Sequence, residues 1–272
     1  MRRKIATFAA IMPNDFFQFR QFTVRQGLCA MKVGTDGTLL GAWASVPSVV
    51  VYASKRASIL DIGTGTGLIA LMMAQRHPQA LVTAIDIDPQ AVRQARENAA
   101  ASPFADRINI IEGDIRKLLS PPLEGSGEVF PFDAIVCNPP FFDSSLESPD
   151  AQRTLARHTS SLSYRELMAC AWQLLSEDGV LSVVIPSDCK ARLEAEATLQ
   201  GFFLTRSCAV RTTPKKPPRR FLLAFKKHPE TSPGPSKGGE SDDFPPPSEG
   251  LGEVLVIGSD AYRELMKDFY LK

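Results

Sequence analysis

The sequence lacks the marks of several protein classes. Its five cysteines, Cys29, Cys137, Cys170, Cys189 and Cys208, include no C-x-x-C pair, so we expect neither a disulfide framework nor a zinc site, and a cytoplasmic location fits best. No run of about 18 apolar residues is present, which argues against a membrane-spanning helix. The formal net charge is only +1, which excludes a polybasic or acidic solvating chain but still allows a local patch that binds nucleic acid.

What the chain does have is enough apolar sequence for a core. It contains 272 residues, of which 44% are hydrophobic, so wholesale disorder is excluded. Proline and glycine gather in two segments, 120–131 and 228–252, whose composition is typical of flexible linkers. We therefore predict one domain over residues 14–272 with flexible inserts at these two places. Residues 1–13 are interpreted as an N-terminal extension that need not be native, with Met12 as an alternative start.

Short apolar runs alternate with helical stretches along the chain. This alternation predicts an α/β fold with right-handed crossovers and a mostly parallel sheet. The expected strands are Ser58–Ile62, Leu81–Asp86, Ile108–Glu112, Phe132–Cys137, Val180–Ile185, Gly201–Arg211 and Arg219–Phe225, with a possible last strand at Glu253–Ile257. The expected helices are Leu68–Arg76, Pro89–Ala101, Tyr164–Leu175, Ser187–Leu199 and a short one at Ala261–Asp268.

A glycine-rich turn follows the first of these strands. Its pattern is D-x-G-x-G-x-G, formed by Asp61, Gly63, Gly65 and Gly67. A dinucleotide-binding turn needs glycine where this chain has Leu68. An acid at the end of the strand repels a pyrophosphate and attracts an ammonium group. The turn therefore favours a ligand with an amino-acid end, such as S-adenosylmethionine.

Two further acids stand where the same ligand needs them. Asp86 ends the second strand, 25 residues after Asp61, and a carboxylate there can accept the hydroxyls of a ribose. Asp88, followed by Pro89, is the rival for that role but is better explained as a helix N-cap. Asp114 follows the third strand and is a candidate acceptor for an adenine amino group, although an acid before a helix is most often only a cap.

The fourth strand runs into a stiff loop, Asn138-Pro139-Pro140-Phe141. Strand ends of a doubly wound sheet meet at one edge, so this loop is expected beside the glycine turn. The side-chain oxygen of Asn138 and the carbonyl of Pro139 can each accept one N–H of a planar amine. That arrangement would favour a pyramidal nitrogen whose lone pair faces a methyl donor. Phe141 offers a face on which a base can stack.

Together these motifs resemble the class I S-adenosylmethionine-dependent methyltransferases of the N6-adenine/N5-glutamine type. Three more stretches narrow the resemblance: Met31–Trp43 before the glycine turn, Gln152–His158 after the Asn-Pro-Pro-Phe loop, and Asp268–Lys272 at the end. In this combination the chain is similar to the bacterial tRNA(Val) adenine-N6 methyltransferase family. The resemblance implies a Rossmann-like, doubly wound, mostly parallel seven-stranded sheet, and N6-methylation of the adenine 3′ of the anticodon (position 37).

The resemblance also implies roles for individual residues. The cofactor's methionyl end would be held by Asp61, Gly63, Gly65 and Gly67, its ribose by Asp86 and its adenine by Asp114. The cofactor site would be closed by Lys32, Thr35 and Asp36. The target adenine would be held by Asn138, Pro139, Pro140 and Phe141. A monomeric, cytoplasmic, metal-free enzyme is implied in the same sense.

Contact with RNA is expected from two groups of basic residues. One is the loop that carries Lys215, Lys216, Arg219 and Arg220, and the other is Arg157 with His158; phosphate contacts from them would position a stem while a loop base enters the pocket. Three alternatives stay open. They are glutamine N5-methylation of release factors, adenine methylation of DNA, which requires base flipping, and an RNA-binding protein without catalysis.

Overall fold

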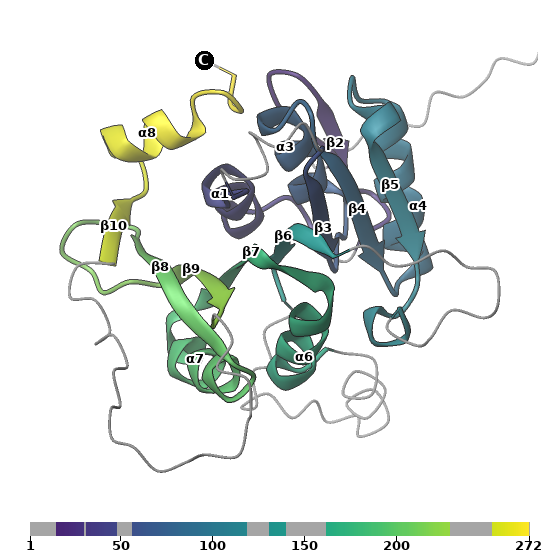
Figure 1. Cartoon of the computed structure of the whole chain (residues 1–272). Coiled ribbons are helices and arrows are strands. Elements are labelled where there is room, and N and C mark those ends of the chain that lie inside the picture. The colour runs from purple at the N-terminus through teal and green to yellow at the C-terminus, as the bar shows by residue number, and fades with distance from the viewer. Residues whose placement is uncertain are drawn as a thin grey trace, which may run out of the picture.

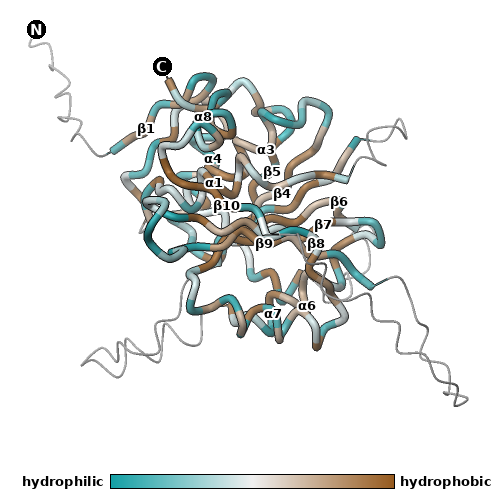
Figure 2. The backbone as a smooth tube through the Cα atoms, turned by 90° about the vertical axis from the view of Figure 1, so that its left-hand side faces the viewer, coloured by the Kyte–Doolittle hydropathy of each residue, from teal (hydrophilic) through white to brown (hydrophobic). Residues whose placement is uncertain are grey.

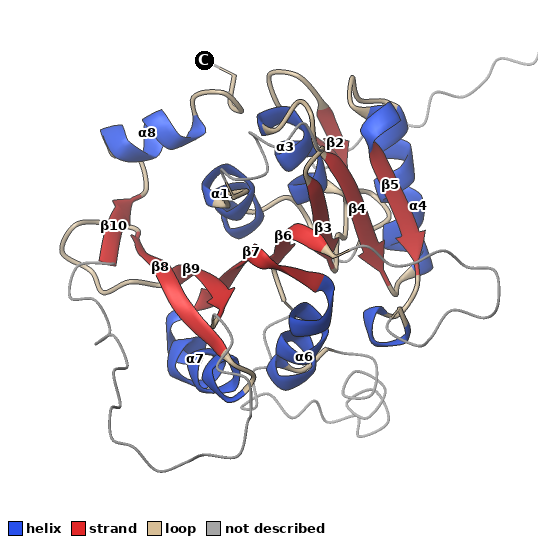
Figure 3. Ribbon diagram, viewed as in Figure 1, coloured by secondary structure: helices blue, strands red, loops and turns tan. Residues whose placement is uncertain are grey.

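One central sheet organises the computed structural model, which describes residues 15–29, 31–47, 56–118, 131–139, 162–228 and 252–271. Across the sheet the strands run in the order β10-β8-β9-β7-β6-β3-β4-β5 (Figures 1 and 3). Only β9 is antiparallel to its neighbours. The bounds are β3 (Ser58–Ile62), β4 (Leu81–Asp86), β5 (Ile108–Glu112), β6 (Phe132–Cys137), β7 (Leu175–Pro186), β8 (Phe202–Arg211), β9 (Arg220–Lys227) and β10 (Gly252–Val256).

The α/β class expected from the sequence is confirmed, whereas the expected number of seven strands is wrong for the described sheet. The eighth strand is β10, which pairs in parallel with β8 from Gly252 opposite Ser207 to Val256 opposite Arg211. The count of seven came from the family resemblance. The last apolar run of the chain extends the edge of the sheet because β8 offers it an unpaired side.

Side chains along the inner strands alternate between two hydrophobic cores. In β3, Ile59 joins the core on one face and Leu60 the core on the other. In β7, Val183 and Val184 divide in the same way. Successive strand residues point to opposite faces, so a strand that is apolar throughout is covered on both sides. Figure 2 shows this apolar layer through the middle of the molecule.

Helices cover both faces of the sheet, as Figure 1 shows. One face carries α1 (Thr35–Trp43), α3 (Leu68–Arg76) and α4 (Pro89–Ala100), together with α8 (Asp260–Met266) and the hairpin of β1 (Phe16–Gln18) and β2 (Thr23–Arg25). The other face carries α6 (Tyr164–Leu174) and α7 (Lys190–Leu199), and three 3-10 turns, η1 (Ala105–Arg107), η2 (Ile115–Lys117) and η3 (Ser187–Cys189), complete the described elements. The helix expected at Ser187–Leu199 thus begins as η3 before it continues as α7.

Local capping explains where the helices begin. The carboxylate of Asp88 accepts the backbone N–H of Gln90 at 2.9 Å, and Pro89 opens α4, as expected from the sequence. At the start of α6, Ser163 and Glu166 cap each other's backbone N–H groups. These bonds satisfy N–H groups that a helix cannot pair internally.

Helix α1 was not expected as a helix, because its sequence contains Gly37 and Gly41 and has little apolar periodicity. Every residue from Gly37 to Trp43 is buried. A Cβ on Gly41 would lie 2.7 Å from the sulfur of Met72 and 2.8 Å from its Cβ, so α3 packs directly against the backbone of α1. The close approach of two helices, not propensity, therefore determines this element.

We expect Gly41→Ala to destabilise the protein. The added methyl group overlaps the side chain of Met72, and overpacking of a buried contact costs about 1–3 kcal/mol. The free energy of unfolding measured with urea should fall by that amount even though alanine is the better helix former. Gly34→Ala is the matched control, because its nearest heavy atom lies 3.8 Å away. Equal stability of wild type and Gly41→Ala would contradict the close packing.

The order of the strands predicts a binding site at the carboxyl ends of the parallel strands. The chain builds β3, β4 and β5 outwards in one direction and then returns to add β6 on the other side of β3. Ligands of such sheets bind outside the carboxyl ends of the strands at this reversal. Asp61 and Ile62 end β3 there, beside Val136 and Cys137 at the end of β6.

Some sequence predictions lie outside the described residues. They concern the N-terminal extension and nearly all of the two inserts, of which only Pro131, His228 and Gly252 are described. The single-domain boundaries with these inserts stay a prediction. Within the described residues, no helix is long and apolar enough to span a membrane. All five cysteines are free thiols.

Candidate cofactor and active site

The glycine turn joins the end of β3 to the start of α3. All three glycines have positive φ: 70° at Gly63, 55° at Gly65 and 80° at Gly67. A Cβ on Gly63 or Gly65 would meet no heavy atom within 4 Å, so the backbone at both positions borders open space. Gly67 differs, because a Cβ there would lie 3.3 Å from the Cβ of Ala95. The first two glycines leave room for a ligand, and the third lets α3 approach α4.

Hydrogen bonds fix the turns after β3, β4 and β5 to one another. Asp86 accepts the backbone N–H of Gly65 at 2.8 Å through one carboxylate oxygen and that of Asp88 at 3.0 Å through the other. Its own carbonyl accepts the N–H of Gly113 at 2.9 Å. Asp86 therefore links the three turns, and its contact with a ribose stays a prediction.

Two cavities open beside these turns. The first, of about 260 Å³, has apolar walls from Ile62, Ile85 and Ile115 next to the acids Asp86, Asp88 and Asp114. The second, of about 300 Å³, lies along Lys32–Gly37 and the glycine turn. Four residues line both cavities: Met31, Gly63, Gly65 and Asn138. The two cavities thus form adjoining halves of one site, with the glycine turn and Asn138 at their junction.

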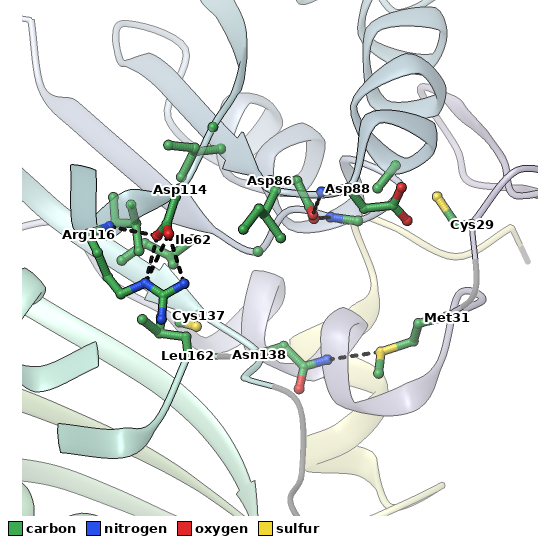
Figure 4. A pocket seen from close by; sticks show the side chains of 17 residues that line it. Cys29, Met31, Ile62, Asp86, Asp88, Asp114, Arg116, Cys137, Asn138 and Leu162 are labelled. Carbon is green, nitrogen blue, oxygen red and sulfur yellow. Dashed lines mark hydrogen bonds and ion pairs between the residues drawn. The ribbon is translucent and has the colours of Figure 1, made fainter. Parts of the chain in front are cut away.

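Asn138 follows β6 and lines both cavities, and Figure 4 shows its side chain beside Met31. Its Nδ2 donates to the sulfur of Met31 at 3.9 Å, a long and weak contact. Its Oδ1 is buried and has no hydrogen-bond partner. A buried acceptor without a donor is costly unless a ligand supplies the donor. The side-chain oxygen stays the predicted acceptor for an N–H of a molecule in the site.

Asp61 is placed differently from the sequence expectation. It is fully buried, and neither cavity is lined by it. One oxygen accepts the hydroxyl of Thr64 at 2.6 Å and the backbone N–H of Ala70 at 3.1 Å, while the other has no partner. Burial raises the pKa of Asp61 to about 7. In this structure its contacts brace the glycine turn and the start of α3, and a direct contact with an ammonium group stays a prediction.

The burial of Asp61 predicts a pH-dependent stability. Its pKa is about 7 in the folded protein against an ordinary value of 3.8, so the folded state holds the proton more tightly. Stability from this group is fully present below about pH 4 and is lost as the pH rises to about 7. Asp61→Asn removes this titration. Urea unfolding at several pH values, without cofactor, should show wild-type stability falling relative to Asp61→Asn across that window; parallel pH profiles would contradict it.

Asp114 lines the first cavity, but its carboxylate is already engaged. It caps η2 by accepting the backbone N–H of Arg116 at 3.0 Å, and it forms a two-pronged ion pair with the Arg116 guanidinium at 2.8–3.0 Å (Figure 4). Arg116 also reaches Glu166 of α6 at 3.0 Å. The Arg116 guanidinium lowers the pKa of Asp114. The acid is therefore held ionised on the cavity wall.

The remaining candidates divide into four groups. Lys32, Thr35 and Asp36 line the second cavity, and their part in closing the cofactor site stays a prediction. Lys215, Lys216 and Arg219 are exposed, whereas Arg220 forms an ion pair with Asp36 at 2.7 Å. Pro139, the residue after Asn138, is buried. The last group, Pro140, Phe141, Arg157 and His158, lies outside the described residues.

Sequence reasoning missed several lining residues. Arg116 and Leu162 belong to no motif, and Met31 begins the Met31–Trp43 stretch but was given no role of its own. Ile87 had a usable signal, because it directly follows the ribose-binding candidate Asp86 and lines the same wall. Among the described residues, no group of three or more His, Cys, Asp or Glu side chains that could hold a metal is found.

These features fit S-adenosylmethionine. The open space at Gly63 and Gly65, the apolar walls and the acid at the end of β4 match an adenosyl group joined to an amino acid. Such a fold with such a site defines the class of methyltransferases. The family model of the methyltransferase small domain matches residues 48–213. A solved structure from Agrobacterium tumefaciens, described as a predicted O-methyltransferase, has a TM-score of 0.51 and 18% identity over 86% of this chain and 94% of that one, which supports the fold alone.

Sequence relatives narrow the class. A protein of Phocaeicola vulgatus is 50% identical over 215 residues, covering 79% of this chain and 85% of the relative. One of Bacteroides thetaiotaomicron is 44% identical over 262 residues, covering 96% and 99%. Both are named tRNA1(Val) (adenine(37)-N6)-methyltransferase. The chain belongs to this family of enzymes, and family membership implies S-adenosylmethionine as the methyl donor.

Proposed function

We propose that this protein transfers a methyl group from S-adenosylmethionine to N6 of an adenine in tRNA, at position 37 of tRNA1(Val). The observation that carries the proposal is the buried, unpartnered Oδ1 of Asn138 at the junction of the two cavities. The printed names of the relatives supply the substrate. A tRNA-modifying enzyme works where tRNA is, so we also propose a cytoplasmic location and, from the family resemblance, a metal-free monomer.

The cofactor roles proposed for individual residues follow the two cavities. In the first cavity, Asp86 accepts the ribose hydroxyls and Asp114 the adenine amino group. The second cavity, with Lys32, Thr35 and Asp36, takes the methionyl end beside Gly63 and Gly65. Asp61 and Gly67 support this end from behind, through Thr64 and through the packing of α3 on α4.

The chemistry asks little acid–base work of the protein. The bound cofactor supplies an electrophilic methyl group on a sulfonium. Asn138 Oδ1 and the carbonyl of Pro139 accept the two N–H groups of the target amine and orient its lone pair toward the junction of the two cavities, where the sulfonium lies. Because both acceptors are fixed before the substrate enters, they need no reorganisation during transfer. Phe141 as a stacking face and Pro140 as a stiffener stay predictions.

Methyl transfer from labelled S-adenosylmethionine to total tRNA tests the proposal. We expect label in RNA only and, after nuclease digestion, in N6-methyladenosine. A tRNA1(Val) transcript with guanine at position 37 should accept none. Label in protein would support the glutamine N5 alternative, and label in DNA the DNA alternative. No transfer to any of them, with cofactor bound, would support a protein without catalysis. Each of these three results overturns the tRNA proposal.

RNA contact is proposed for the exposed basic loop, and it predicts a salt-dependent effect. We expect Lys215→Ala with Lys216→Ala to weaken tRNA binding by about tenfold and to reduce the slope of log K against log salt by about 1.5–2, because two phosphate contacts are lost. Cofactor affinity should not change. The matched control replaces two other cations, Arg56 and Lys226, with alanine. Both lie near the amino ends of the parallel strands, away from the basic loop. An equal loss in the control would argue against a local contact. Arg157 and His158 stay predicted RNA contacts.

A further inference from the structure

An ion pair joins the basic loop to the wall of the cofactor cavity. Nε of Arg220 lies 2.7 Å from Oδ2 of Asp36, and the side chains are only 33% and 25% exposed. Asp36 lies in the first turn of α1 and lines the second cavity. Arg220 is the first residue of β9 and directly follows the exposed loop 212–219. The two residues are 184 positions apart, so the tertiary fold alone brings them together.

The loop itself is firmly attached to the sheet. Ser187, just after β7, donates its hydroxyl to the carbonyl of Pro218 at 2.6 Å and its N–H to that of Arg219 at 3.2 Å. Arg219 in turn donates its N–H to Val210 at 2.9 Å. The end of the loop that adjoins Arg220 is therefore bonded both to the end of β7 and to β8.

The register puts this attachment at the edge that carries the active site. Arg220 pairs with Pro186 at the end of β7. Three residues earlier in β7, Val183 pairs with Cys137, the residue before Asn138. The exposed cations of the loop, Asp36 and Asn138 thus all lie at the carboxyl ends of the parallel strands.

We propose that the Asp36–Arg220 ion pair couples RNA binding at the basic loop to cofactor binding in the second cavity, so that each ligand strengthens the binding of the other. This inference rests on the proposed tRNA substrate. An RNA phosphate on Lys215, Lys216 or Arg219 holds the loop, the loop holds Arg220, and Arg220 holds Asp36 and the first turn of α1 against the cavity. Arg220 is then a positioning residue and not an RNA contact, in contrast to its sequence assignment. Coupling between two binding sites is reciprocal by thermodynamic necessity.

The test measures the dissociation constant of S-adenosylhomocysteine with and without a saturating tRNA1(Val) transcript. In wild type we expect the tRNA to lower that constant by about 5- to 20-fold, within the usual range of coupling between sites. The ratio of the dissociation constants without and with tRNA should fall below about twofold in Asp36→Asn and in Arg220→Gln. The double variant should show no further loss. The matched control is Glu253→Gln. It breaks a similar ion pair, with Arg206 at 2.7 Å, that contacts Trp43 at the other end of α1, and it should keep the wild-type ratio.

The alternatives give different patterns. In one alternative Asp36 binds the cofactor directly and Arg220 has no part. Asp36→Asn then weakens the binding of S-adenosylhomocysteine even without RNA. Arg220→Gln keeps the full tRNA-induced change in the dissociation constant, and this result overturns the coupling. If Arg220 contacts RNA directly, Arg220→Gln weakens tRNA binding without cofactor, and its effect multiplies with that of Asp36→Asn. If the wild-type protein binds tRNA and its affinity for S-adenosylhomocysteine does not change, this inference is overturned and the proposed function still stands. Wild type that binds no tRNA overturns the proposed function itself.

Discussion

Asn138→Ala is expected to bind the cofactor normally and to lose about 100- to 1,000-fold in the rate of methyl transfer. Its Oδ1 is the buried, unpartnered acceptor at the junction of the cavities. The removal of one fixed polar group that acts mainly in the transition state typically costs a factor of this size. Single-turnover transfer to tRNA at saturating cofactor measures the rate, and calorimetric titration with S-adenosylhomocysteine measures binding.

A matched variant shows whether the effect is local. Asn109→Ala removes the same amide from an exposed position of β5, and it should keep the wild-type rate within about twofold. Met31→Leu keeps the bulk beside Asn138 and removes only the weak N–H···S contact, so it should lower the rate only slightly. An Asn138→Ala protein with wild-type turnover, or one that loses cofactor binding to the same extent as turnover, would count against the role given to this oxygen.

Asp86→Asn is expected to raise the dissociation constant of S-adenosylhomocysteine by about 10- to 100-fold. Hydrogen bonds to a charged acceptor are worth about 1.5–3 kcal/mol each, and the amide offers one acceptor oxygen where the carboxylate offers two. The same change disturbs one of the two backbone N–H groups, of Gly65 and Asp88, that the carboxylate accepts. Direct binding in a titration, with a melting curve to confirm folding, is the measurement.

The neighbouring acid provides the control. Asp88→Asn keeps a good N-cap for α4 and should change cofactor affinity by no more than about threefold. A 2′-deoxyribose analogue of S-adenosylhomocysteine separates ribose recognition from damage to the turn. It should bind wild type more weakly, and its disadvantage should shrink in Asp86→Asn. A larger loss in Asp88→Asn than in Asp86→Asn would move the ribose to Asp88.

The local signals of the sequence were sufficient to predict the first four strands of the central sheet. The runs at Ser58–Ile62, Leu81–Asp86, Ile108–Glu112 and Phe132–Cys137 form strands with those bounds. They were recognisable because each is a short, mainly apolar run bounded by turn residues, and β3 and β6 are in addition buried almost throughout. The cap at Asp88 and the glycine turn were readable for a similar reason, since each depends on a residue and its immediate neighbours.

Helix α1 was beyond such signals, and so was the place of β10 in the sheet, although the run at Glu253–Ile257 had indicated a possible last strand. The Gly37 and Gly41 positions of α1 are unfavourable for an isolated helix and become favourable only when α3 lies against them. Likewise β10 forms part of the sheet only because β8 presents an open edge to it.

By itself the sequence determined the strand-helix alternation, the glycine turn, the acid at the end of β4 and the amide after β6, because each follows from residues adjacent in the chain. Only the tertiary structure decided that Asp61 lies buried behind the turn instead of on the cavity wall. It also engaged Asp114 with Arg116 and Arg220 with Asp36. Burial and ion pairing depend on which distant segments the fold brings within a few ångströms, and no local pattern carries that information.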